Sequence, residues 1–147
     1  MHFISGGAYN GKANWVKNHY SLGVLEKTDY LWLSAYKKDL LAEDLTAIPQ
    51  KVLVLEGLER WVYTLIEKHR IDDVRKYFQK IIQDWITWAS KDGNKLVIIG
   101  VDMSKGVVPI DANLRNWRDV TGFIYQDIVK QCSVFHYVWY GIAKQLK

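Results

Sequence analysis

HFISGGAYNGKANW, residues 2–15, places an apolar run before a pair of glycines, and a Gly-Lys pair before a segment with helical spacing. Residues 6–12 fit the pattern G-x-x-x-x-G-K, whose glycines let the main chain curl so that successive N–H groups point at phosphate oxygens. The pattern needs a strand before it and a helix after it, and we predict a strand at 2–5 and a helix at 13–19. The predicted phosphate-binding residues are Gly6, Gly7, Ala8, Tyr9, Asn10, Gly11, Lys12 and Ala13.

The end of this loop departs from the usual pattern. Lys12 would reach the outer phosphates as a point charge, and the positive end of the following helix would add to its field. Ala13 stands where a Ser or Thr hydroxyl would bind Mg²⁺. Because Mg²⁺ keeps several waters, a water can replace that hydroxyl at reduced affinity. We expect a loop that binds phosphate beside a weakened Mg²⁺ site; the alternative is a glycine turn with a surface lysine.

Strand-like and helix-like stretches alternate along the rest of the chain. Strands are predicted at 30–36, 51–57, 95–101 and 133–142, a partly helical connection at 37–50, and helices at 58–70, 71–90 and after Asp111, which is suited to cap the last helix. The alternation favours right-handed crossovers and a largely parallel sheet. We therefore predict an α/β protein with a three-layer P-loop (RecA-like) fold, a mostly parallel central sheet and one domain spanning residues 1–147.

Sheets of this kind bind ligands beyond the carboxyl ends of their strands. In this chain those ends are residues 5–12, 34–38, 56–57 and 100–106. Glu56 ends a buried strand, where an acidic residue commonly orients a metal shell through water; the alternative is a solvated carboxylate. Asp102 is a second candidate, and its alternative role is to cap the turn at 103–106. The predicted catalytic residues are Lys12, Glu56 and Asp102, with Glu56 as the indirect metal ligand.

The composition excludes several classes of protein. The net charge of +4 comes from basic residues spread along the chain, which does not favour nucleic-acid binding. The single cysteine, Cys132, excludes an internal disulfide and a thiolate zinc cluster. We find no run of 18 apolar residues and no signal-peptide pattern, so we expect a cytoplasmic protein without a membrane partner. Seven Trp and nine Tyr would fill a core or, alternatively, form a stacking surface.

Several segments together resemble the adenosylcobinamide kinase / adenosylcobinamide-phosphate guanylyltransferase family of cobalamin biosynthesis. GGAYNGKA resembles the family loop GGARSGKS, and LVLEGLERWV resembles its strand that ends in an acidic residue before a helix. The ending WYGIAKQLK is similar to the family's last strand. The block VDMSKGVVPIDANLRNWRDVTGFIYQ keeps in register Gly106, Val108, Pro109, Arg115, Arg118, Asp119, Gly122 and Gln126.

The resemblance implies a kinase that phosphorylates the hydroxyl of adenosylcobinamide with ATP or GTP and Mg²⁺, in a homo-oligomer that is a trimer in relatives. Family members then attach GMP through a guanylylated histidine that precedes the acidic strand. The corresponding segment here, 37–50, is short and contains no histidine, so we expect that activity to be lost. We expect structural roles for His2, His19, His69 and His136. The alternative function is a degenerate nucleotide- or corrinoid-binding protein without turnover.

The same block leaves the roles of two arginines open. Arg115 and Arg118 lie three residues apart and would share one face of a helix. They could pair with Asp111 or Asp119, or reach phosphate.

Overall fold

The computed structural model describes residues 1–26 and 28–147, and it confirms the predicted α/β class. In chain order the elements are β1 (His2–Ser5), α1 (Lys12–His19), β2 (Tyr30–Ser34), the short 3-10 helix η1 (Ala35–Lys37), β3 (Val52–Glu56), α2 (Leu58–Ile66), α3 (Ile71–Ala89), β4 (Lys95–Ile99), α4 (Ala112–Gln131), β5 (Val134–Trp139) and β6 (Ile142–Gln145).

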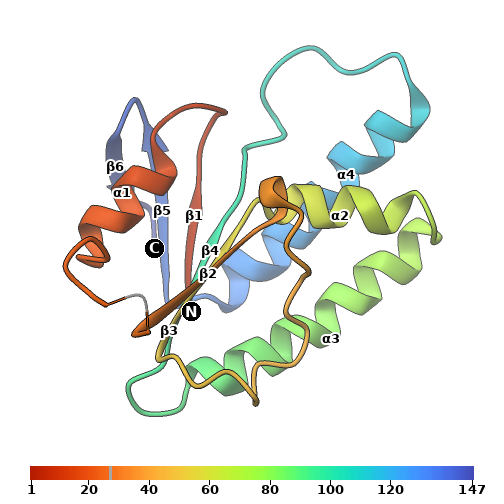
Figure 1. The fold of residues 1–147 in the computed structure, drawn as a ribbon. Helices are drawn as coiled ribbons and strands as arrows, with labels where there is room; N and C mark the ends of the chain where they lie inside the picture. Colours follow the sequence, from red (N-terminus) through yellow and green to blue (C-terminus); the bar gives the residue numbers. More distant parts are fainter. Residues whose placement is uncertain (27) are drawn as a thin grey trace.

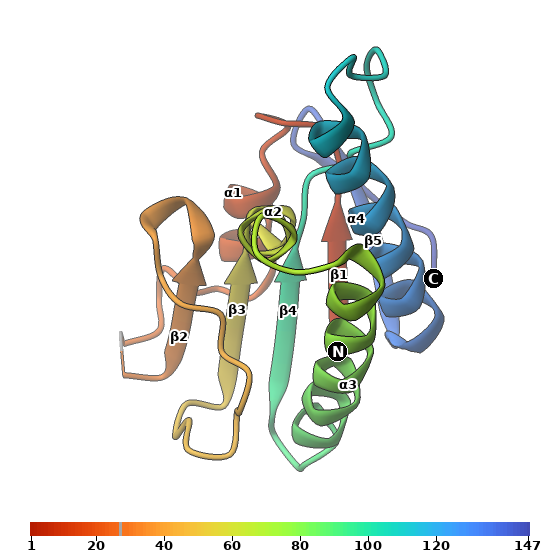
Figure 2. The same ribbon diagram turned by 90° about the vertical axis from the view of Figure 1, so that its right-hand side faces the viewer.

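The strands form one sheet in the order β2-β3-β4-β1-β5-β6, and every neighbouring pair is parallel except β5 and β6. Helix α1 covers one face of the sheet, and α2, α3 and α4 cover the other (Figure 1). Seen from the side of these three helices, the parallel strands all point to the same edge (Figure 2). The three-layer arrangement with a mostly parallel sheet is therefore as predicted.

The central strands are apolar because both of their faces are covered. In β3, Leu53, Val54 and Leu55 have no exposed surface, and β1 and β4 are buried in the same way. The larger part of the core lies between the sheet and the layer of α2, α3 and α4, around Phe78 and Trp85. This layer fixes the strands, so the loops at their carboxyl ends start from well-defined positions.

The connection between β2 and β3 corrects one expectation. We expected part of residues 37–50 to be helical, but only Lys37, the last residue of η1, is helical, and residues 38–50 form no helix. Two buried tryptophans hold it instead: Trp61 Nε1 donates to Asp39 O and Trp85 Nε1 donates to Ala42 O, both at 2.9 Å. Leu45 is buried against the same core. The segment thus packs along the helix layer because two of its carbonyls accept hydrogen bonds from tryptophans of α2 and α3.

The C-terminus corrects a second expectation. The single strand predicted at 133–142 is a hairpin, in which β5 and β6 pair antiparallel around Tyr140 and Gly141. Both turn residues have positive φ, 48° and 79°, as a type I′ turn requires. The pair Tyr140-Gly141 occupies the turn, where Asn-Gly would be the usual sequence signal, so the sequence did not indicate a hairpin.

The start of α4 confirms another expectation. Asp111 caps the helix, because its Oδ1 accepts a hydrogen bond of 2.9 Å from Leu114 N.

Among the described residues, no helix combines the length and the apolar character that a membrane crossing needs.

Candidate phosphate-binding site

The loop between β1 and α1 is curled, and its glycines make the curl possible. Gly6 has φ 149°, and a Cβ there would lie 2.1 Å from Val138 O on the neighbouring strand. Gly11 caps α1 with φ 83°, and a Cβ there would lie 3.3 Å from Gly141 Cα. The side chain of Tyr9 is fully exposed, so its ring does not close the loop.

The curl leaves a row of main-chain donors free. In the part of the chain that the structure describes, no N–H group of residues 7–13 donates a hydrogen bond to another protein group. The first N–H groups of α1 belong to this row and carry the positive end of the helix dipole. Successive free N–H groups beside a helix N-terminus form an anion-binding concavity.

The ammonium group of Lys12 lies inside the loop. Lys12 is 8% exposed, and its Nζ donates to Gly7 O at 2.7 Å and to Gly6 O at 3.1 Å. Burial lowers the pKa of this amine, while the carboxylates of Glu59 and Glu56 oppose the shift. The lysine thus holds its charge where the phosphates of a ligand would lie, and loop carbonyls serve as its partners.

The loop borders a cavity of about 600 Å³ at the carboxyl ends of the strands. All four of the segments predicted at the carboxyl ends of the strands contribute residues to it, as the sheet topology requires. Its lining residues are Ala8, Tyr9, Asn10, Gly11, Lys12, Ala13, Asn14, Tyr36, Glu56, Ile99, Gly100 and Val101.

Glu56 and Ala13 decide what metal chemistry this cavity supports. Glu56 Oε2 accepts a hydrogen bond of 2.9 Å from Trp32 Nε1, and no described residue donates to Oε1. Ala13 contributes only a methyl group to the wall. The described residues include no cluster of three His, Cys, Asp or Glu side chains that could hold a metal ion. The described part of the wall thus offers a cation a single carboxylate, so Mg²⁺ would fit there only with water or other ligands completing its shell.

Glu59, which the sequence analysis did not select, lies directly beneath the cavity. This carboxylate is only 2% exposed, and it accepts hydrogen bonds from Tyr36 Oη, from Val101 N at 3.0 Å and from Tyr125 Oη at 3.1 Å. Burial and the nearby carboxylate raise the pKa of both phenols, which keeps them protonated as donors. Two of the donors, Tyr36 and Val101, line the cavity, so Glu59 fixes its floor.

Asp102 lies beside the cavity rather than in its wall. Its Oδ1 accepts from Ser104 N at 2.9 Å and from Ser104 Oγ, so it caps the turn that follows β4. Its Oδ2 accepts a hydrogen bond of 2.9 Å from Tyr137 Oη. Burial works against ionisation, but these hydrogen bonds together lower the pKa of Asp102. The structure thus brings Lys12 and Glu56 into one cavity and places Asp102 behind the loop.

The two arginines of α4 hold the loop that follows β4. Arg115 Nη1 donates to Pro109 O at 3.1 Å and to Ile110 O, and Arg118 Nη2 donates to Ser104 O at 2.8 Å. Neither side chain forms an ion pair with an aspartate of this helix, and neither lines the cavity. Of the partners considered for them, the structure thus shows neither aspartate, and both arginines bind main-chain carbonyls of the loop.

Three histidines gather on the face that α1 covers. His2 Nε2 lies 2.8 Å from His136 Nδ1, and His2 Nδ1 lies 2.7 Å from Tyr20 Oη. The ring of His19 lies 5.8 Å from that of His2, centroid to centroid. None of the described residues that line the cavity is a histidine. These contacts fit the structural roles expected for the three.

We predict that stability falls as the pH drops from 7.5 to 5. Burial, and then the neighbouring histidines, lower the pKa of His2 to about 3, and burial lowers the pKa of His136. In the unfolded chain these groups take up protons near pH 6.5, so acid favours unfolding by about 1.4 kcal/mol per pH unit and proton. Urea unfolding at the two pH values measures the loss, and His2→Phe should reduce it. An unchanged free energy of unfolding in the natural chain would contradict the prediction.

The comparisons with known proteins address the family directly. Residues 26–146 match the family model described as cobinamide kinase / cobinamide phosphate guanyltransferase. None of the curated proteins that were compared matches the chain. The matched residues include 37–50, which the motif resemblance did not cover. They leave out residues 6–13, so the assignment of a phosphate-binding loop depends on the geometry described above. The chain belongs to the cobinamide kinase / cobinamide phosphate guanyltransferase family, whose members use nucleotides in cobalamin biosynthesis.

Proposed function

We propose that this chain is a kinase that transfers a phosphoryl group from ATP or GTP to the hydroxyl of adenosylcobinamide. The observation that carries the proposal is the buried Lys12 ammonium beside free main-chain donors, in one cavity with Glu56. Phosphoryl transfer is mainly a matter of positioning and charge neutralisation, and these groups supply both.

The chain's own residues divide the work. Lys12 exchanges Gly6 O and Gly7 O for oxygens of the outer phosphates, and the N–H groups of residues 7–13 hold the rest of the phosphate tail. Glu56 would hold Mg²⁺ through its water shell, and the ion, when bound, would supply charge neutralisation at the phosphates. The acceptor oxygen forms a bond to the γ-phosphorus, and the bond from that phosphorus to the β–γ bridging oxygen breaks. The hydroxyl proton passes to a carboxylate, for which Glu56 and Asp102 are the candidates.

We further propose that the guanylyltransferase step is lost. A histidine nucleophile must reach the α-phosphate of the nucleotide. No histidine is found in the described lining of the cavity, and the sequence of residues 37–50 contains none. His2, His19 and His136 make contacts with one another on the face covered by α1.

One incubation tests both proposals, because the phosphate ester and the guanylylated protein are measured separately. Incubation of the protein with GTP, Mg²⁺ and adenosylcobinamide should yield the phosphate ester, and GTP labelled at its α-phosphate should leave no label on protein histidine. The ester is identified by mass spectrometry. Failure to form it with ATP and with GTP, by protein with a native unfolding transition, would exclude the kinase. Acid-labile label on the protein would exclude the loss of guanylyl transfer.

A second candidate function is nucleotide or corrinoid binding without turnover. Ala13 favours it, because the wall of the cavity lacks the hydroxyl that would bind Mg²⁺. The substitution Ala13→Ser separates the two candidates. For a kinase, we expect it to raise the Mg²⁺-dependent rate on the order of tenfold, equivalent to about 1.4 kcal/mol of barrier. For a binding protein, turnover stays absent while nucleotide binding persists.

We propose a cytoplasmic homo-oligomer as the setting for this function. Edge strand β6 and the residues that follow it expose Ile142 and Leu146, which offers a surface for association. The trimer expected from the family resemblance is the specific form to test by light scattering.

A further inference from the structure

Two tyrosines, one in the phosphate loop and one in the hairpin turn beside it, adopt a backbone conformation that bulky residues rarely take. Tyr9 has φ 57° and Tyr140 has φ 48°, and they are two of the four non-glycine residues with positive φ in the described chain. Both side chains are exposed, Tyr9 fully and Tyr140 to 78%. Such outliers persist only where the surrounding structure over-determines them, and they cluster at active sites and ligand clamps.

The two tyrosines are held in fixed positions relative to each other, because the β5–β6 turn is hydrogen-bonded to the phosphate loop. Tyr140 N donates to Asn10 Oδ1 at 3.2 Å, and Gly141 N donates to Asn10 O at 2.9 Å. The contact is close enough that a Cβ on Gly11 would lie 3.3 Å from Gly141 Cα. The aromatic turn is thus fixed relative to the free main-chain donors of the loop.

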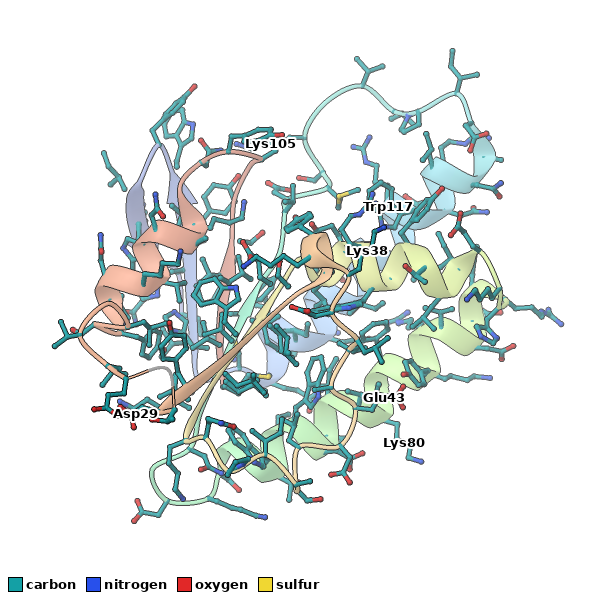
Figure 3. All side chains as sticks on the ribbon, in the orientation of Figure 1. Asp29, Lys38, Glu43, Lys80, Lys105 and Trp117 are labelled. Carbon is teal, nitrogen blue, oxygen red and sulfur yellow. The ribbon has the colours of Figure 1, made fainter. Side chains whose placement is uncertain are left out.

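Trp139 adds a second ring to this turn. It is 59% exposed, its ring centroid lies 5.4 Å from that of Tyr140, and the ring planes differ by 34°. Lys105 Nζ lies 6.0 Å from the centre of the Trp139 ring. Lys105 also shares a hollow with Gly7 and Ala8, and Figure 3 shows it beside the loop between β1 and α1. We call Tyr9, Trp139 and Tyr140 the aromatic rim.

The sheet order indicates which end of a nucleotide faces this rim. Glu56 ends β3, which lies two strands from β1 on one side, and the β5–β6 turn lies on the other side of β1. The phosphate that is transferred must lie on the side of the carboxylate. The ribose and the base therefore extend toward the aromatic turn.

On the basis of the proposed function, we infer that the aromatic rim stacks against the base of the bound purine nucleoside triphosphate. Stacking uses the flat face of the base and not its hydrogen-bonding edge, so it does not separate adenine from guanine. The rim thus adds affinity for ATP and GTP alike. It contributes nothing to the binding of inorganic tripolyphosphate, which carries the same kind of anionic tail without a base.

The substitution Tyr140→Asn tests this inference, because it removes the ring and favours the turn. Asn-Gly is a preferred pair for a type I′ turn, so the variant should melt at a higher temperature. Calorimetric titration with constant Mg²⁺ should show ATP and GTP affinities about tenfold lower, as expected for the loss of one stacking contact. The affinity for tripolyphosphate should stay unchanged. Ser21→Asn is the matched control, because Ser21 also has a left-handed φ, 53°, but follows the other end of α1.

Each other outcome has a definite meaning. If Tyr140→Asn binds ATP and GTP as tightly as the natural chain, the inference is wrong. A variant that changes oligomeric mass but not nucleotide affinity would make the rim a contact between copies and overturn the inference. If the natural chain binds tripolyphosphate as tightly as ATP, the base makes no contact and the inference fails alone. If the natural chain binds neither compound, the proposed function fails together with the inference.

Discussion

Lys12→Met should lower the affinity for both ATP and tripolyphosphate about a hundredfold, since hydrogen bonds to a charged group contribute roughly 1.5–3 kcal/mol. The substitution keeps an unbranched stem in the loop and removes the only ammonium group among the described residues that line the cavity. Nucleotide titration by calorimetry measures the loss. Because Lys12 donates to Gly7 O and Gly6 O in the free protein, its ammonium already lies within the loop, and on binding it exchanges these carbonyl partners for phosphate oxygens.

Lys17→Met is the matched control for this measurement. Lys17 lies on the same helix, is exposed, and has its Nζ 5.5 Å from the centre of the Trp32 ring. Its removal changes the net charge of the chain by the same amount and should leave the affinity nearly unchanged. Equal affinities of the natural chain and Lys12→Met would remove the phosphate loop from the proposed function, whichever of the two candidate functions is considered.

The parts of the fold that sequence alone predicts are those with a local signal. The glycine spacing before Lys12 predicted the loop, because a tight curl at Gly6 leaves no room for a side chain. The apolar runs within 51–57 and 95–101 predicted buried strands, and the structure has β3 at Val52–Glu56 and β4 at Lys95–Ile99. The carboxyl ends of these strands then located the cavity, with Glu56 in its wall.

The parts that were missed depend on contacts between distant residues. Residues 38–51 are held by tryptophans of α2 and α3, and nothing within the segment announces that contact. The hairpin turn at Tyr140 depends on hydrogen bonds to Asn10, 130 residues earlier. Asp102 was left open between two roles because its partner, Tyr137, lies 35 residues later.

Glu59 was missed for a different reason, because a glutamate in the first turn of a helix is usually an exposed residue that favours the helix dipole. A signal was present in the pattern. Leu58, Trp61 and Val62 form the buried face of α2, and Glu59 lies between them in the helical spacing. A charge next to such a face is a candidate for burial, and a buried charge needs several hydrogen-bond partners.

Glu59→Ala should lower the free energy of unfolding by about 3–5 kcal/mol, because it removes the shared acceptor of three hydrogen-bond donors. Tyr36 Oη, Val101 N and Tyr125 Oη would lose their acceptor together. Each donor left unsatisfied inside the protein costs about 1–3 kcal/mol. Because small domains are stable by only about 5–15 kcal/mol, the variant should unfold at a much lower urea concentration.

Two further variants separate the carboxylate from its position in the helix. Glu67→Ala removes an exposed glutamate just beyond the last residue of α2 and should change stability by less than about 0.5 kcal/mol. Glu59→Gln keeps one oxygen acceptor but replaces the other by an NH₂ group that faces a donor, so its stability should fall between those of Glu59→Ala and the natural chain. If Glu59→Ala is as stable as Glu67→Ala, the three donors find water or other acceptors, and the floor of the cavity does not depend on this carboxylate.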